Sequence, residues 1–239
     1  MNKKSTIKTI ITILGLGFIA KLLSTIARIL MTRELGVTGM GLYQLATPCM
    51  LLVITLAQFG LPTAMATLVS RHKEKAKLLL STGLVMAFFI AIIMMILVTL
   101  LAPVIANNIL KNDDLTLTIY ALALLIPLVS LSAIIKGFFL GLNEIELTST
   151  STIMEEVGRI IFIICFLNFF VDKGANYGSF GAMIGVCVGE IFQTLYMVIF
   201  NDKKLYLRVN ELLAFEKEDC LYESKNIVRL SLPLTLSRL

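Results

Sequence analysis

The chain has 239 residues, of which 57% are apolar and only 15% are charged. Soluble domains are typically about 45–50% apolar and about 25% charged, so this composition excludes an ordinary soluble protein. The net charge of +5 comes from basic residues grouped beside long uncharged stretches, which is how membrane proteins carry their charge, and it does not indicate nucleic-acid binding. We therefore expect an all-α integral membrane protein that crosses the bilayer several times.

Six membrane spans are predicted in chain order. They are roughly Ile10–Met31, a span within Leu42–Ser70, a span within Leu78–Leu110, Leu115–Ile135, Thr148–Val171 and Tyr177–Phe200. The second and third stretches contain no charged residue, and Pro48, Pro62 and Pro127 are expected to kink their helices.

The distribution of Lys and Arg predicts the orientation of these spans, because cytoplasmic loops carry the excess of basic residues. If the N-terminus is cytoplasmic, the outer loops hold only Arg33, Lys111 and Lys173. The inner segments then hold Lys3, Lys4, Lys8, Arg71, Lys73, Lys75, Lys77, Lys136, Lys203, Lys204, Arg208, Lys217 and Lys225. We expect a multi-pass membrane protein with a cytoplasmic N-terminus.

After the sixth span the sequence becomes polar and then apolar again. Residues 201–226 mix charged and apolar residues, which favours a cytoplasmic amphipathic linker lying on the membrane surface. Residues 227–239 are apolar but too few to cross about 30 Å of hydrocarbon. We therefore expect a six-helix bundle over 1–200, a linker over 201–226, and the start of a truncated seventh helix over 227–239, as in a fragment of a larger protein.

Two cations within the first span are the strongest functional signal. Lys21 and Arg28 are seven residues apart, which on a helix places them on one face about 10 Å apart along the axis. Ser24 lies between them on that face. A charge inside a span is costly against lipid, so these side chains are expected to face an aqueous cavity or a partner. Such a cationic face predicts an anionic cargo. The alternative is that the side chains snorkel to the membrane surface, which is easier for Arg28, near the outer end of the span, than for Lys21.

Four further charged residues lie inside predicted spans. Glu155 and Arg159 have the i, i+4 spacing that permits a direct ion pair, and such a pair serves either packing or gating. Glu156 points about 100° away and is expected to face the inner surface. Glu190 stands alone in the sixth span. It is a candidate for binding a coupling ion, H⁺ or Na⁺, or for a hydrogen bond to a neighbouring helix.

No arrangement of residues predicts an enzyme. The chain has one His and four Cys, without the spacing of a metal site or of a nucleophile and its base. It also lacks the glycine-rich loop that binds nucleotide phosphates. We therefore expect neither catalysis nor a cofactor nor a metal ion.

Four motifs carry a resemblance to a known family. They are Thr-Arg-Glu-Leu-Gly-Val-Thr-Gly-Met-Gly-Leu-Tyr-Gln at 32–44, Gln-Phe-Gly-Leu-Pro at 58–62, Lys-Gly-Phe-Phe-Leu-Gly at 136–141 and Glu-Glu-Val-Gly-Arg at 155–159. With Leu-Ser-Leu-Pro-Leu-Thr-Leu-Ser-Arg at 230–238, they resemble the stage V sporulation protein B family. That family is part of the polysaccharide-transporter branch of the multidrug/oligosaccharidyl-lipid/polysaccharide (MOP) exporter superfamily.

The resemblance implies a fold of two six-helix bundles around a central cavity, of which this chain holds the first. It implies a flippase for undecaprenyl-diphosphate-linked oligosaccharide or peptidoglycan precursor, in sporulation or cell-envelope synthesis. Lys21 and Arg28 match basic positions of the family's first helix, which implies that they bind the diphosphate. Glu155 and Arg159 match the family's Glu-x-x-x-Arg pattern.

Two other functions remain open. A multidrug and toxic compound extrusion (MATE)-type drug/cation antiporter would have mainly acidic residues in its cavity, whereas here the first span is cationic. A non-transporting membrane scaffold for envelope synthesis would leave the cavity charges dispensable.

Overall fold

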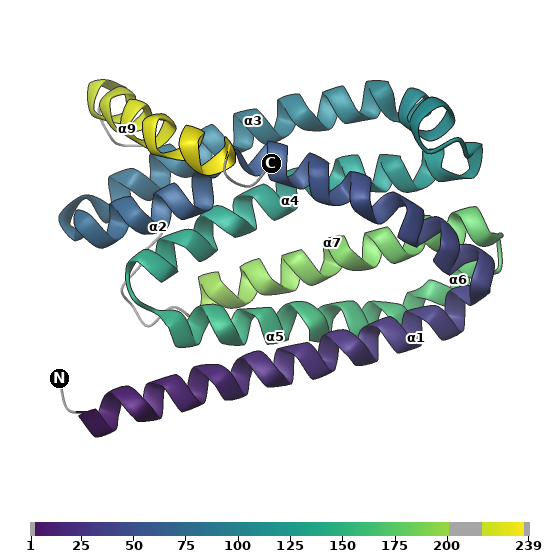
Figure 1. The fold of residues 1–239 in the computed structure, drawn as a ribbon, viewed down its shortest axis with the longest axis horizontal. Helices are drawn as coiled ribbons and strands as arrows, with labels where there is room; N and C mark the ends of the chain where they lie inside the picture. The colour runs from purple at the N-terminus through teal and green to yellow at the C-terminus, as the bar shows by residue number, and fades with distance from the viewer. Residues whose placement is uncertain (1–2, 201–216, 237–239) are drawn as a thin grey trace.

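The computed structural model describes the backbone of residues 3–200 and 217–236, and the side chains of 11–200 and 223–233. All of the elements in these ranges are helices (Figure 1). They are α1 (Lys3–Gln58), α2 (Leu61–Arg71), α3 (Ala76–Val104), α4 (Thr116–Gly141), α5 (Ile145–Phe162), α6 (Asn168–Val171), α7 (Ala175–Ile199) and α9 (Lys217–Leu236). Single 3₁₀ turns at Lys73–Lys75 and Asp113–Leu115 precede α3 and α4, and π turns at Ile105–Ile109 and Ile163–Leu167 follow α3 and α5.

Four stretches of the described residues are long and apolar enough to cross a membrane: Ile11–Arg71, Lys73–Ile109, Asp113–Gly141 and Ala175–Ile199. The chain is therefore a multi-pass membrane protein. The fifth predicted span falls on α5, its π turn and α6, which are not among these four stretches. It carries Glu155, Glu156 and Arg159, so the count of six spans stays a prediction.

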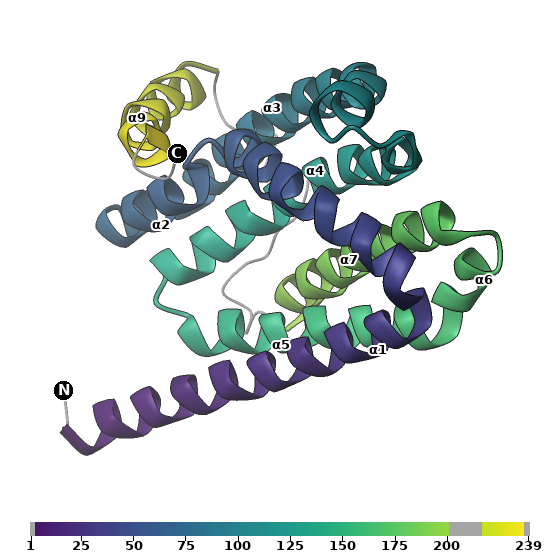
Figure 2. The same cartoon turned by 45° about the vertical axis from the view of Figure 1, so that its right-hand side comes forward.

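The first two predicted spans are arms of one long element, α1. Its two arms meet at Gly36, which has φ 64° and ψ −173° and is the one residue of α1 with non-helical backbone angles. Figures 1 and 2 show the first arm running along α5 and the second arm returning towards α2. Phe59 and Gly60, both with positive φ, end the second arm, and Pro62 lies in the first turn of α2.

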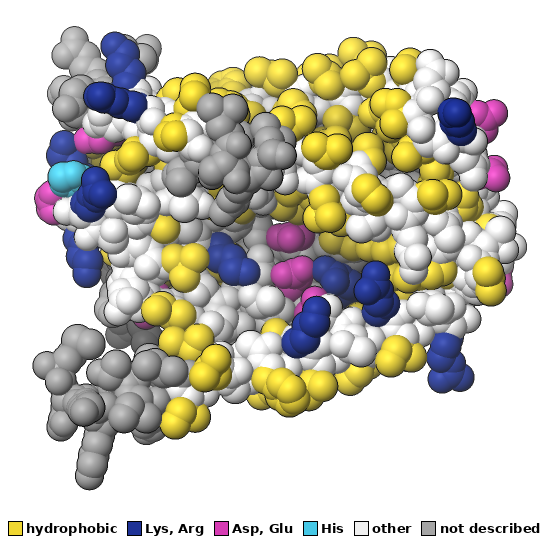
Figure 3. Space-filling model, in the orientation of Figure 1, with side chains coloured by type: hydrophobic (Ala, Val, Ile, Leu, Met, Phe, Trp, Pro, Cys, Tyr) yellow, Lys and Arg dark blue, Asp and Glu magenta, His cyan; other side chains and the backbone are white. Residues whose placement is uncertain are grey.

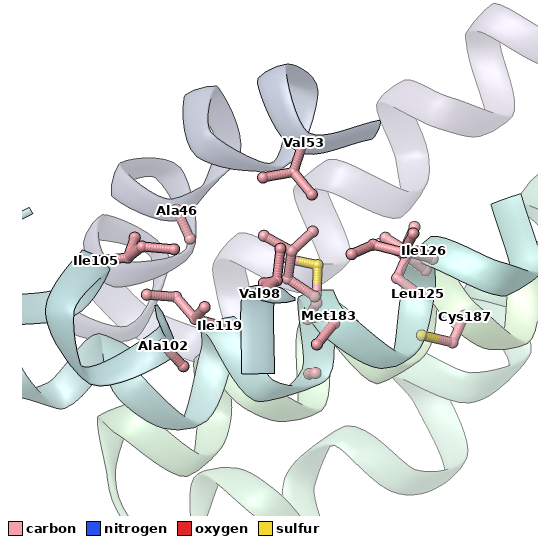
Figure 4. Packing of buried hydrophobic residues seen from close by; sticks show 14 of the residues in the cluster. Ala46, Val53, Val98, Ala102, Ile105, Ile119, Leu125, Ile126, Met183 and Cys187 are labelled. Atoms are coloured by element: carbon pink, nitrogen blue, oxygen red, sulfur yellow. The ribbon is translucent and has the colours of Figure 1, made fainter. Parts of the chain in front are cut away.

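The main core lies where the second arm of α1 packs with α3, α4 and α7 (Figure 4). Small residues such as Ala46 and Ala102 allow close approach, while Leu125, Ile126 and Met183 fill the space between helices. Buried residues occur on every side of α4, as expected for a helix enclosed by others. By contrast, large apolar side chains of α1 and α3, such as Phe18 and Leu100, are exposed.

The expected boundary between linker and seventh helix, at 226, falls inside a continuous helix. α9 begins at Lys217 and continues to Leu236; residues 201–216 and 237–239 lie outside the described residues. α9 packs against α2 and α3 (Figure 2), where the Lys75 ammonium donates to Glu223 at 2.9 Å. The Asn226 amide donates to the same carboxylate at 3.1 Å. The division into bundle, linker and second bundle is not tested by these contacts.

Candidate functional site

One face of the molecule is hollowed at its centre, and basic and acidic side chains gather in this hollow between apolar margins (Figure 3). Two neighbouring cavities lie along the first arm of α1. One, of about 330 Å³, is lined by Gly17, Ala20, Lys21, Ser24, Ser149, Thr152 and Glu156. The other, of about 170 Å³, is lined by Ser24, Ala27, Arg28, Met31, Tyr43, Thr47 and Arg159. Ser24 belongs to both, and we call the two together the α1–α5 cavity.

The local sequence of α1 explains where the α1–α5 cavity forms. Gly17, Ala20, Ser24 and Ala27 recur at helical spacing, so one face of the first arm carries only small side chains. Ala27 is buried there. The longer side chains of Lys21 and Arg28 stand beside this strip of small residues and reach into the space above it.

Lys21 and Arg28 therefore line two adjoining cavities that share Ser24. Both cationic side chains are exposed. Within the part of the chain that the structure describes, no carboxylate lies within ion-pair distance of either one. The charges of Lys21 and Arg28 are therefore available to a ligand, although their role stays a prediction.

Arg159 holds two carboxylates on the opposite wall. Its Nη2 lies 2.8 Å from Glu155 Oε1, which is the predicted i, i+4 pair, and its Nη1 lies 3.1 Å from Glu156 Oε2. The expectation that Glu156 faces the inner surface was wrong. Glu156 is only 7% exposed and lines the cavity with Lys21, because the forked guanidinium binds the i−3 and i−4 side chains at the same time.

A chain of hydrogen bonds joins this wall to two other helices. Gln193 of α7 donates from Nε2 to Glu155 Oε2 at 3.0 Å, and Ser132 of α4 donates to Gln193 Oε1 at 2.8 Å. Gly189 allows α7 to approach α5 this closely, because a Cβ at this position would lie only 2.9 Å from the carbonyl oxygen of Glu155. Glu155 therefore ties α5 to α7, and through Gln193 to α4.

Glu190 is not the isolated carboxylate that its sequence surroundings suggest. It faces the Ser132 hydroxyl and lies within electrostatic range of Glu155, Arg159 and Lys136. The structure thus brings all three candidate coupling residues, Glu155, Arg159 and Glu190, into one polar group between α4, α5 and α7. Their role in coupling or gating stays a prediction.

Lys136 was grouped by sequence with the basic residues of the inner segments. The structure places it within α4, which continues to Gly141 rather than ending near Ile135. Its ammonium donates to Thr152 Oγ1 at 2.9 Å, and Thr152 lines the cavity.

Sequence reasoning missed Lys136, Glu156 and Gln193 as members of the site, because their partners lie on other helices or depend on side-chain rotamers.

The site offers cations, hydroxyl groups and paired carboxylates rather than metal ligands. No group of three or more His, Cys, Asp or Glu side chains suited to a metal ion occurs among the described residues. Such an arrangement suits the binding of a charged molecule in a partly hydrated space.

Comparisons with known proteins agree with this picture. Residues 6–239 match the family model described as "Polysaccharide biosynthesis protein". Stage V sporulation protein B of Bacillus subtilis (strain 168) is 26% identical over 100% of this chain and 47% of its own length. Lipid II flippase MurJ of the same organism is 26% identical over 82% of this chain and 40% of its own length. The chain thus spans less than half the length of these curated relatives.

Solved structures show the same fold. A crystal structure of MATE in the straight conformation has a TM-score of 0.65 at 17% identity and covers 95% of this chain and 52% of that one. Lipid II flippase MurJ in its inward closed conformation has a TM-score of 0.62 at 15% identity, covering 93% of this chain and 47% of that one. The α1–α5 cavity therefore lies in a fold that transport proteins also adopt.

Proposed function

Because the chain belongs to the polysaccharide biosynthesis protein family, within the MOP exporter superfamily, we propose that it is part of a flippase for a lipid-linked anionic saccharide. The cargo would be undecaprenyl-diphosphate-linked oligosaccharide or peptidoglycan precursor, carried across the bacterial cytoplasmic membrane in sporulation or envelope synthesis. The protein would act as a transporter and not as an enzyme.

One observation carries this proposal: Lys21 and Arg28 line the hollow with no ion-pair partner among the described residues, while Glu155 and Glu156 of the far wall share the Arg159 guanidinium. Three cations, Lys21, Arg28 and Arg159, thus stand against these two carboxylates, so the formal charge along the cavity is positive. A diphosphate satisfies such charges better than a neutral sugar, since Arg donates two parallel hydrogen bonds to phosphate oxygens and Lys acts as a point charge. The prenyl chain would remain in the bilayer, outside the hollow.

The coupling of transport to an ion gradient, H⁺ or Na⁺, belongs to the same proposal. Glu190, Glu155 and Arg159 are the candidate groups, since they connect three helices that would move relative to one another. A change of charge at one of these groups would alter contacts on all three helices at once, and a shift between two conformations depends on such a difference in contacts.

The test is a flipping assay with the full-length protein in proteoliposomes, using a fluorescent prenyl-diphosphate saccharide. The double substitution Lys21→Ala and Arg28→Ala should abolish flipping and leave membrane insertion and expression unchanged. The matched control is Arg33→Ala, which removes an exposed cation near the bend of α1 and outside the lining of the α1–α5 cavity. Flipping by the double variant at the unsubstituted rate would contradict the proposal.

A drug/cation antiporter is the second candidate, and the acidic residues of the site favour it. Glu155, Glu156 and Glu190 lie close together, and the fold is also that of MATE structures. This candidate predicts that expression of the protein confers resistance to a cationic dye such as ethidium, and that Glu190→Gln removes the resistance.

A further inference from the structure

Lys136 of α4 lies beside the α1–α5 cavity, where its ammonium donates to Thr152 of the cavity lining. We propose that Lys136 binds the phosphate groups of the cargo together with Lys21 and Arg28, so that a diphosphate is held between α1 and α4. This inference rests on the proposed function and adds a ligand from α4, which neither the family's first-helix pattern nor the comparisons assign.

The backbone of Lys136 is fixed by close packing on both sides. Ile135 and Phe138 are buried in the core formed with α2 and α3. At Gly137 a Cβ would collide with the backbone carbonyl of Pro62, so α4 and α2 touch there without an intervening side chain. The Lys136 side chain is consequently directed towards α5, where its ammonium meets Thr152.

The ammonium of Lys136 is only partly satisfied. It has three N–H donors, and the structure gives it one hydrogen-bond acceptor, the neutral Thr152 Oγ1 at 2.9 Å. No carboxylate lies within ion-pair distance of it among the described residues. Glu190 acts on it only at longer range. A half-buried ammonium within a membrane-spanning helix favours a negatively charged partner.

Thr152 connects this ammonium to the cargo space. Thr152 lines the same cavity as Lys21, Ser24 and Glu156. The hydrogen bond to Thr152 therefore holds the Lys136 ammonium, with its two remaining N–H donors, at the edge of that cavity. Glu156 forms its ion pair with Arg159, at 3.1 Å, and not with Lys136. A diphosphate carries several anionic oxygens, and it can accept hydrogen bonds from cations on two walls at once.

The experiment uses the full-length protein in nanodiscs, with geranyl diphosphate as the probe and calorimetry as the measurement. Lys136→Met keeps the aliphatic stem and removes the charge. It should weaken binding of the probe about tenfold or more, because a charge-assisted hydrogen bond is lost. Lys136→Arg should bind within about threefold of the unsubstituted protein. Lys73→Met removes an exposed lysine from the turn between α2 and α3 and should have no effect.

The outcomes separate this inference from the proposed function. If Lys136→Met binds the probe as tightly as the unsubstituted protein while Lys21→Met does not, Lys136 is not a ligand and the proposed function stands. If neither substitution changes binding, both are overturned. Loss of binding in Lys136→Arg as well as Lys136→Met would indicate a packing role and would also overturn the inference.

A second measurement avoids substitution altogether. In the unsubstituted protein, geranyl diphosphate should protect Lys136 from acylation by acetic anhydride, as read by peptide mass spectrometry, while labelling of Lys73 is unchanged. Labelling of Lys136 that is equal with and without the probe would overturn the inference even if the variants fail to fold.

Discussion

At the scale of single residues, Arg159 is the cation that holds the two carboxylates of the far wall of the cavity. Its guanidinium pairs with Glu155 and Glu156, and the side chains of all three are at most 20% exposed. Carboxylates this deep in a membrane protein are tolerated because they are paired. Because these carboxylates pair with Arg159, neither Lys21 nor Arg28 of α1 lies in an ion pair with them.

Arg159→Met should destabilise the protein strongly, because it leaves two partly buried carboxylates without their cation. We expect a loss of roughly 3 kcal/mol in the free energy of unfolding, the lower end for breaking a buried pair. The measurement is the thermal midpoint in detergent. Adding Glu155→Gln and Glu156→Gln should recover most of the loss, and Arg33→Met should be neutral. A melting curve for Arg159→Met that matches the unsubstituted protein would contradict this assignment.

At the scale of elements, glycines decide how closely helices approach. Gly137 brings α4 against the carbonyl of Pro62, whereas an added Cβ at Gly41 would meet no atom within 4 Å. Gly137→Ala should therefore lower the free energy of unfolding by about 1–3 kcal/mol, as overpacking does. Gly41→Ala should be neutral or stabilise by up to about 1 kcal/mol through helix propensity. Equal thermal midpoints for the two variants would argue against the close contact of α2 and α4.

The contact of α9 with α2 and α3 should depend on pH. Burial alone would raise the pKa of Glu223, but hydrogen bonds from Lys75 and Asn226 and the Lys75 charge outweigh it and hold the pKa below its ordinary value. A carboxylate with a lowered pKa stabilises the folded state above its unfolded pKa of about 4.3. This contribution is lost as the pH falls through the lower folded pKa.

Spin labels at Lys73→Cys and Lys225→Cys, in a cysteine-free background, should therefore give a narrow distance distribution at pH 7 that broadens in acid. Glu223→Gln should give the same distribution at both pH values, because its side chain does not titrate. The change should be modest, since Lys75 is 48% exposed and exposed pairs contribute about 0–1 kcal/mol. A distribution that narrows in acid would contradict the sign of this prediction.

At the scale of the whole molecule, the distribution of basic residues predicts that the N-terminus is cytoplasmic. A Cys placed at Lys111 or Lys173, on the expected outer side, should react with a membrane-impermeant maleimide in intact cells. A Cys placed at Lys73 should react only after the cells are permeabilised. The native cysteines are first replaced by Ser. The reverse pattern of labelling would invert the proposed orientation.

The sequence predicted those features that depend on local spacing. The helical class, the shared face of Lys21 and Arg28 and the pair of Glu155 with Arg159 all follow from the geometry of one helix. The burial of Glu156, the link from Glu155 to Gln193 and the approach of Lys136 to Thr152 depend on how α4, α5 and α7 cross. No short stretch of sequence determines these crossings, so the sequence could not predict them.

The most direct test of the account compares two probes on the same full-length protein in nanodiscs: geranyl diphosphate, an anion, and ethidium, a cation. The account predicts that the unsubstituted protein binds the diphosphate and not ethidium, and that Lys21→Ala with Arg28→Ala abolishes diphosphate binding. Binding of ethidium in preference to the diphosphate, or an unchanged diphosphate affinity in the double variant, would contradict it.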